Sequence, residues 1–168
     1  MKKRIFWSAA KFLLPVTGAM MCLAAWPGVA REAPNLPRFA SLKSDLVNMR
    51  EGPSSEHPIK WVYRHVGLPV EILAEYDVWR RVRDSDGEIG WIHVALLSPE
   101  RTALITGSAA APVRRGADSE SALIAYAEPG ATALLHGCGP FACELDFGDI
   151  DGWVERAYLW GVFPDEEL

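Results

Sequence analysis

The chain has 168 residues, 49% of them hydrophobic and 23% charged, so it can form one ordinary domain or two very small ones, and wholesale disorder is excluded. Its 22 Asp and Glu outnumber its 17 Lys and Arg, for a formal net charge of −5. Nucleic acid and anionic lipid surfaces select for Lys and Arg, so neither is an expected partner.

Residues 1–30 have the pattern of a secretory signal peptide. Lys2-Lys3-Arg4 forms a basic start, an apolar stretch runs from Phe12 to Trp26, and Gly28-Val29-Ala30 places small residues where signal peptidase cuts. The alternative is a membrane anchor, but Pro15 interrupts the apolar run, which is shorter than the ~20 residues that span a bilayer. We therefore expect cleavage near Ala30 and an exported protein in the periplasm or secreted.

Cleavage would make the protein more acidic. Residues 1–30 carry four basic residues and no acidic one, which leaves 13 Lys and Arg against 22 Asp and Glu, a net charge of −9. We expect the mature chain to be soluble, with no stable membrane insertion after signal cleavage and no nucleic-acid partner.

The mature sequence contains two similar units of about 60 residues. Three blocks recur in the same order at offsets of 62 to 64 residues: Met49-Arg50-Glu51-Gly52 as Val113-Arg114-Arg115-Gly116, Tyr63 and Gly67 as Tyr126 and Gly130, and Gly90-Trp91-Ile92 as Gly152-Trp153-Val154. The one-residue differences between these offsets fit single-residue insertions or deletions in loops. The pattern predicts a tandem duplication.

Each unit is expected to be a small β-barrel. Short runs rich in Val, Ile, Trp and Tyr predict five strands in the first unit: Leu46–Arg50, Lys60–His65, Pro69–Leu73, Val78–Arg83 and Gly90–Val94. Asp86-Gly87 is a strong hairpin signal between two of them. Helix is limited to a turn near Val94 to Leu97 and its counterpart near Arg156 to Leu159. The predicted fold is all-β, with two tandem small barrels of about five short strands and a helical turn each.

The first unit resembles the bacterial SH3 (SH3b-like) domain. The resemblance covers nearly all of residues 44–103, and the stretches that carry it follow in the order that the family shows: Val47–Pro53, Pro58–Arg64, Gly67–Val70, Trp79–Asp84, Asp86–His93 and Leu97–Ala103. The second unit keeps Gly152-Trp153-Val154 but is degenerate, with Phe141–Leu145 standing where the first unit has Trp79–Val82. The resemblance implies an extracytoplasmic recognition module, often linked with the cell wall, and implies no reaction.

The resemblance and the repeat together predict the domain limits. They are an N-terminal segment at 31–43, an SH3-like module 1 at 44–103, a linker at 104–111, a degenerate SH3-like module 2 at 112–164 and a tail at 165–168. The first module is the expected binder, and the second is expected to be a stabilising companion.

The three cysteines predict one disulfide. Cys22 would leave with the signal peptide, so the mature chain keeps the pair Cys138 and Cys143. In an oxidising compartment, a disulfide that staples a hairpin is favoured over free thiols or a metal site. A metal site would need two further ligands, and His136 alone is near in sequence.

The sequence shows no arrangement typical of catalysis. The four histidines (His57, His65, His93 and His136) lack metal-ligand or general-base spacing, and no serine lies in a nucleophile-elbow pattern. Asp84, Asp86 and Glu88 alternate as Ca²⁺ ligands do, but the 12-residue loop is missing, so they predict a solvated hairpin. We expect no catalytic residue, no cofactor and no metal, and thus no enzyme.

Aromatic residues are the remaining candidates. SH3-like folds present aromatic-lined grooves to extended peptides, which makes four residues candidates for ligand binding: Tyr63, Tyr76, Trp79 and Trp61. Four others are expected to be structural, with the tryptophans packing where the last strand meets the helical turn: Trp91, Trp153, Gly90 and Gly152.

The leading functional hypothesis is a non-catalytic exported binding protein that recognises peptidoglycan, through a cell-wall peptide or glycan. The alternative is a periplasmic adaptor or scaffold that binds an envelope protein. A cell-wall hydrolase is a distant third.

Overall fold

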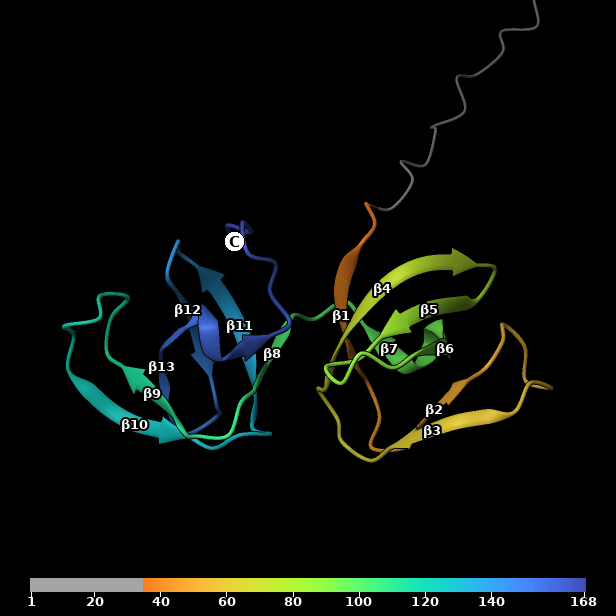
Figure 1. Cartoon of the computed structure of the whole chain (residues 1–168), viewed down its shortest axis with the longest axis horizontal. Helices are drawn as coiled ribbons and strands as arrows, with labels where there is room; N and C mark the ends of the chain where they lie inside the picture. The colour runs from red at the N-terminus through yellow and green to blue at the C-terminus, as the bar shows by residue number, and fades with distance from the viewer. Residues whose placement is uncertain (1–34) are drawn as a thin grey trace, which may run out of the picture. The chain divides into compact units, whose positions relative to one another are not determined.

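Residues 35–168 are described by this computed structural model. The predicted signal peptide and its cleavage site near Ala30 lie outside the described residues. Among the described residues, no helix has the length and apolar character needed to cross a bilayer. The chain forms two separate antiparallel sheets, each folded into a small SH3-like β domain (Figure 1).

The first sheet has seven strands in the order β3-β2-β6-β5-β4-β1-β7. Their bounds are β1 Arg38–Leu42, β2 Val47–Arg50, β3 Ile59–Tyr63, β4 Pro69–Tyr76, β5 Trp79–Arg83, β6 Ile89–His93 and β7 Leu97–Ser98. A 3-10 turn, η1 (Val94–Leu96), joins the last two strands. The five strands and the helical turn predicted for this unit all appear, within a few residues of their expected ends.

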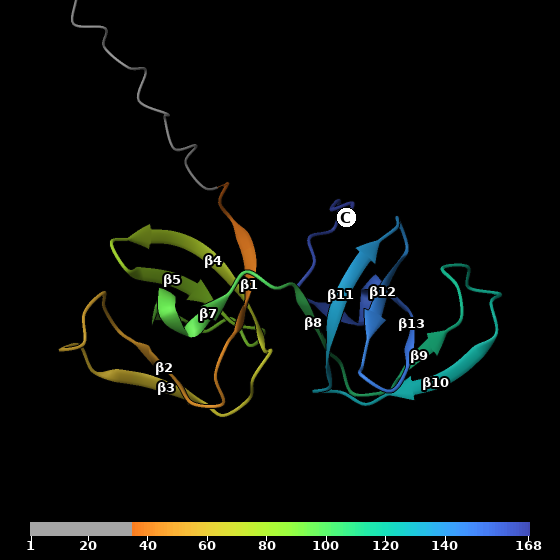
Figure 2. The same ribbon diagram turned by 180° about the vertical axis from the view of Figure 1, so that it is seen from behind.

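The second sheet has the same strand order in its own numbering, β10-β9-β13-β12-β11-β8-β14. Its strands are β8 Thr102–Ile105, β9 Ala111–Arg114, β10 Leu123–Ala127, β11 Thr132–Cys138, β12 Ala142–Asp146, β13 Asp151–Glu155 and β14 Leu159–Trp160. The 3-10 turn η2 (Arg156–Tyr158) precedes β14. Figure 2 shows β11 between β8 and β12 in this sheet.

Each sheet has two more strands than the expected number of about five: β1 and β7 in the first sheet, and β8 and β14 in the second. β1 begins before residue 44, the predicted start of module 1, and pairs with β4 and β7. β8, which spans the predicted end of module 1 and the start of the predicted linker, pairs with β11 and β14 in the second sheet. Residues 102–105 are therefore the first strand of the second module rather than a connection.

Each module has its own core, built from alternate residues of its strands. The first core contains eight buried apolar residues: Ala40, Leu42, Val47, Met49, Val70, Ile72, Val82 and Ile92. The second is richer in alanine and includes both half-cystines: Ala103, Ile105, Ala111, Val113, Ala127, Ala133, Leu135, Cys138, Cys143, Leu145 and Val154.

Phe39 and its neighbours connect residues of the two sheets. Phe39 is 6% exposed and packs edge-on against Trp160, with ring centroids 5.4 Å apart. It also meets Phe163 at 4.7 Å, and the Arg101 guanidinium lies 5.5 Å from its ring. Arg101 in turn pairs with Glu166 at 2.6 Å, which holds the C-terminal tail.

Candidate functional site

One end of each module is formed by a hairpin tip beside the 3-10 turn. In the first module, the Val94 amide donates to the Val78 carbonyl at 2.8 Å, joining η1 to the β4–β5 tip. In the second, the Arg156 amide donates to the Phe141 carbonyl at 3.0 Å, joining η2 to the β11–β12 tip. The two ends are equivalent in topology, so their side chains can be compared directly.

The tip of the first module carries two of the predicted binding residues. Tyr76 and Trp79 are register partners across the β4–β5 turn, and Asp77 between them adopts a left-handed conformation with φ of 47°. Tyr76 is 62% exposed, while Trp79 is half-buried and lies edge-on to His93, with ring centroids 5.4 Å apart. His93 accepts a hydrogen bond from the Ala95 amide through Nδ1. The tip therefore presents an aromatic surface whose tryptophan is held in place.

An ion pair holds this tip together. Glu75 and Arg80 face each other in register, and their side chains lie 3.2 Å apart. Arg38 adds a second contact to the same carboxylate at 2.6 Å.

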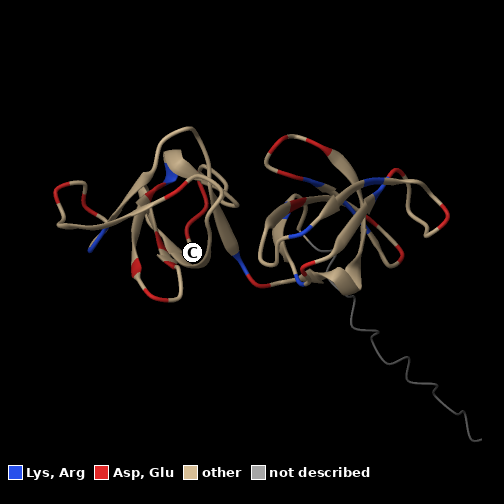
Figure 3. Cartoon of the chain, turned by 90° about the horizontal axis from the view of Figure 1, so that it is seen from below, with Lys and Arg blue, Asp and Glu red and all other residues tan. Residues whose placement is uncertain are grey.

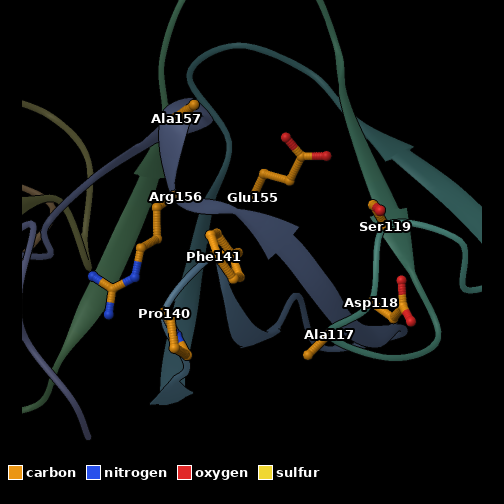
Figure 4. Close-up of a pocket in the computed structure, with 8 residues that line it drawn as sticks. All are labelled: Ala117, Asp118, Ser119, Pro140, Phe141, Glu155, Arg156 and Ala157. Carbon is orange, nitrogen blue, oxygen red and sulfur yellow. The ribbon is translucent and has the colours of Figure 1, made fainter.

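The tip of the second module borders a cavity of about 840 Å³, which we call the tip pocket (Figure 4). Three segments line it: the loop residues Ala117, Asp118 and Ser119, the hairpin residues Pro140 and Phe141, and Glu155, Arg156 and Ala157 around η2. Phe141 is 82% exposed. Figure 4 shows its ring between Pro140 and Arg156 on one side and the 117–119 loop on the other.

The disulfide Cys138–Cys143 closes the β11–β12 hairpin at its tip. The two half-cystines are register partners, so the predicted role as a hairpin staple agrees with the structure. Four residues, 139–142, lie between them and carry Phe141. A covalent link at this point restricts the conformations of the short loop that lines the tip pocket.

Arg156 fixes the other wall of the tip pocket. Its guanidinium donates to the carbonyls of Gly139 and Phe163, both at 2.8 Å, and to that of Glu166. These contacts tie η2 to the hairpin and to the C-terminal tail. A hydrogen bond from Arg101 lowers the pKa of the Glu166 carboxyl despite its partial burial.

The charges around the tip pocket are mainly negative. Asp118 accepts a hydrogen bond from the Glu120 amide at 2.9 Å, and Glu155 lines the pocket beside it. The Arg156 guanidinium is occupied by backbone carbonyls and in Figure 4 points away from the loop that carries Asp118. Figure 3 shows Asp and Glu in many of the loops of both modules.

The other two predicted binding residues lie at the opposite end of the β5–β6 hairpin. Tyr63 donates to the Asp84 carboxylate at 2.7 Å, and Asp84 is only 5% exposed. Burial, followed by the hydrogen bond to Asp84, raises the pKa of the Tyr63 phenol. Hydrogen bonds from Lys60 and then Trp61 lower the pKa of Glu88. The structure thus divides the four candidates into Tyr76 with Trp79 and Trp61 with Tyr63, rather than gathering them in one groove.

The residues predicted to be structural take two different roles in the strands. A Cβ at Gly90 would lie 2.8 Å from the Arg50 carbonyl oxygen, and one at Gly152 would lie 2.9 Å from that of Arg114, so both positions require glycine. Trp91 and Trp153 are half-buried and outside the buried cores. Trp91 faces Arg50 and Arg81 in register, within the sheet rather than at its junction with η1.

One sequence match is wrong by one residue. Met49 pairs with Trp61 and Val113 pairs with Ala125, so Trp61 corresponds to Ala125. Tyr63 therefore corresponds to Ala127, and Tyr126 corresponds to Val62 on the other face of the strand. The error arose because matching Tyr63 with Tyr126 favoured an offset of 63, while the strand register gives an offset of 64. A shift of one residue places a side chain on the opposite face of its strand.

The tip pocket and Phe141 were missed as a candidate site. The signal that was present in the sequence is a Gly-Pro-Phe-Ala run enclosed by Cys138 and Cys143, which places an apolar aromatic at the tip of a stapled turn. The pocket itself draws on three segments that are far apart in sequence, and no local pattern brings them together.

The described residues contain no group of three or more His, Cys, Asp or Glu side chains placed to hold a metal ion. His136 lies 3.7 Å from Asp146, and that pair stands at the surface of β11 and β12.

One of the comparisons with known proteins finds a match to the first module. Residues 43–99 match the family model of the bacterial SH3 domain. Two solved structures from Trichomonas vaginalis are similar to this chain. NlpC2 is 15% identical, and the match covers 80% of this chain and 51% of that chain with a TM-score of 0.34. NlpC1 is 16% identical, and the match covers 77% of this chain and 48% of that chain with a TM-score of 0.34. This chain thus matches about half of each of those two chains, and no curated protein matches it. Residues 43–99 of this chain are thus similar to the bacterial SH3 domain.

Proposed function

We propose that this protein is a non-catalytic, exported binding protein that recognises an extended peptide of the bacterial cell wall through the hairpin tips of its two modules. The observation that carries the proposal is that both modules expose an aromatic side chain at the same tip beside the 3-10 turn. These side chains are Tyr76, 62% exposed, and Phe141, 82% exposed.

Exposed aromatics on the equivalent hairpin tips of both modules favour a recognition surface. An aromatic ring contributes a large apolar area to a contact. Aromatic-lined grooves in SH3-like domains take extended peptides. The tip pocket, at about 840 Å³, lies in the size range of ligand sites and can take several residues of such a peptide.

The proposal assigns no reaction to the tips. The tip pocket is lined by one hydroxyl, that of Ser119, and by no histidine that would activate it. Cys138 and Cys143 are joined to each other and offer no thiolate. Binding is the function that these side chains support.

Co-sedimentation of the mature protein with isolated sacculi tests the proposal. We expect retention at low salt, and we expect Trp79→Ala and Phe141→Ala each to weaken it by about tenfold, as is usual for an aromatic at the centre of an interface. Trp61→Ala is the matched control, because Trp61 is a comparably exposed aromatic at 49% and lies at the opposite end of the β5–β6 hairpin.

Three results would contradict the proposal. Absence of retention would remove the wall as the ligand. Retention that responds to Trp61→Ala and ignores both tip variants would place binding elsewhere. Release of soluble wall fragments by the purified protein would show that it is an enzyme.

A periplasmic adaptor is the second candidate, and an exposed sheet edge favours it. β3 lies at the end of the first sheet and is exposed on both faces, with Ile59, Trp61 and Val62 each between 46% and 49% exposed. An edge strand of this kind can pair with a strand of another protein. A single saturable envelope partner that Val62→Pro releases, without loss of sacculus retention, would assign this role to β3.

A further inference from the structure

The two modules differ in side-chain size at the positions of Trp61 and Tyr63 in the first module. There, the Tyr63 hydroxyl reaches Asp84 at 2.7 Å and lies 3.7 Å from the Met49 sulfur. Asp84 also accepts from the amides of Asp86 and Glu88. Aromatic side chains and a buried carboxylate thus fill the space between β3 and the β5–β6 turn.

The second module has small or apolar residues at the equivalent positions. Register places Ala125 and Ala127 where the first module has Trp61 and Tyr63. Phe147 takes the position of Asp84, because its amide bonds to the Ile150 carbonyl as the Asp84 amide bonds to that of Glu88. The hydrogen-bonded network is therefore absent from this place in the second module, and the volume of two large side chains is missing.

A cavity of about 360 Å³, which we call the β10 cavity, occupies this place. Its apolar walls are Val113, Ala125, Ala127, Ala131, Phe147 and Ile150. Its remaining lining residues are Tyr126, Glu128 and Asp149, all exposed, and no Lys or Arg lines it. The cavity thus combines an apolar interior with two exposed acidic residues in its lining.

We propose that the β10 cavity binds an alkyl chain that ends in a primary ammonium group, such as a lysine-type side chain presented by a peptide. The alkyl part would lie against the alanines and Phe147. The ammonium group would be attracted by the carboxylates of Glu128 and Asp149. An alkyl carboxylate of equal length would be repelled, because no cation lines the cavity. This site is separate from the tip pocket and does not depend on wall binding there.

Titration with hexylammonium, followed through the alanine methyl NMR signals of the mature protein, tests this proposal. We expect saturable shifts at Ala125 and Ala127 and no such shifts with hexanoate. The double variant Glu128→Gln with Asp149→Asn should weaken binding by about tenfold, as expected for two exposed ionic contacts. The variant Glu56→Gln with Glu100→Gln changes the net charge equally at exposed residues that do not line the cavity, and should bind as the unchanged protein does.

Filling the cavity provides an independent test. Ala125→Leu should reduce hexylammonium binding while the free protein keeps its other methyl signals. Three results would overturn the proposal: equal shifts with hexanoate, equal weakening by both charge variants, or unchanged binding by Ala125→Leu. Shifts of the two alanine signals with protein concentration alone would also overturn it, since a second copy of the chain would then cover the cavity.

Discussion

The hairpin tips of the two modules are held by different chemistry at the same register position. In the first module, Glu75 and Arg80 face each other and form an ion pair at 3.2 Å. In the second module, Cys138 and Cys143 face each other and form a disulfide. At equivalent positions, an ion pair thus links β4 to β5 in the first module and a disulfide links β11 to β12 in the second.

The two cores differ in the size of the side chains at three equivalent positions. The first core has Met49, Tyr63 and Val70 where the second has Val113, Ala127 and Ala133. Smaller side chains bury less apolar area and stabilise a domain of this size less. Small domains with weak cores commonly depend on disulfides. At these three positions the second module has smaller side chains than the first, and it carries a covalent link that the first module lacks.

The largest effect is expected from core truncation at equivalent buried positions. Leu145→Ala should lower the free energy of unfolding of the second module by about 3 kcal/mol, because Leu145 is fully buried and its removal leaves a cavity. Val82→Ala should cost the first module less, because fewer carbon atoms are lost. Urea unfolding followed through amide signals of each module measures both losses in free energy of unfolding. An equal loss for the two variants, or a larger loss for Val82→Ala, would contradict the claim that Leu145 and Val82 occupy equivalent core positions.

Removal of the staple should come next. The double variant Cys138→Ala with Cys143→Ala should lower the free energy of unfolding of the second module by about 2 kcal/mol, the value expected for so short a loop. The first module should keep its stability. A reductant should reproduce the change in the unaltered protein and have no effect on the variant. Loss below about 0.5 kcal/mol would contradict the compensating role of the disulfide.

Tyr63 gives the first module a pH dependence that the second lacks. Burial and Asp84 raise the pKa of Tyr63 in the folded chain, whereas the unfolded phenol loses its proton near pH 10. Above pH 10 the unfolded chain therefore binds fewer protons, and stability falls as pH rises, by up to about 1.4 kcal/mol per pH unit. Below pH 10 the contribution is fully present.

Tyr63→Phe isolates this effect. The variant should lose about 1–2 kcal/mol at pH 7, because it leaves the buried Asp84 without the phenol donor, and it should lose the additional decline above pH 10. Unfolding titrations at pH 8 and pH 11 give both values. Parallel declines in the variant and the unaltered protein would show that Tyr63 is not the titrating group.

The smallest effect is expected from the ion pair that stands where the disulfide stands in the second module. Glu75→Gln removes the ion pairs with both Arg80 and Arg38, and should lower the free energy of unfolding of the first module by at most about 1 kcal/mol, since both pairs are partly exposed and water screens them. Added salt should diminish the difference. A cost as large as that of the disulfide would mean that the two links are equivalent in strength as well as in position.

Patterns within a short stretch of sequence predicted the strands with turn signals between them. Asp86-Gly87 and the alternation of Val70 and Ile72 are local, and so are the paired cysteines. β1 and β8 were missed because Arg38–Leu42 and Thr102–Ile105 each form a single short run whose partners lie far along the chain. Their pairing is decided by the closure of each sheet, which no neighbouring residue signals.

The candidate site was predicted only in part, because its contacts also join residues that lie far apart in the sequence. The aromatic surplus indicated recognition, but the pairing of Tyr76 with Trp79 depends on the β4–β5 turn and that of Tyr63 with Asp84 on contact between distant hairpins. Phe141 gained its exposure because it stands at the tip of the stapled hairpin, at the position that Val78 holds in the first module. Composition alone could not distinguish these environments.

The most direct test of the central claim is NMR mapping of a soluble peptide fragment released from the cell wall. We predict saturable shifts at the Trp79 indole N–H, at the ring signals of Tyr76 and at those of Phe141. The Trp61 indole N–H, at the other end of the β5–β6 hairpin, should not move. Shifts confined to Trp61, or none at any of these residues, would contradict recognition through the hairpin tips.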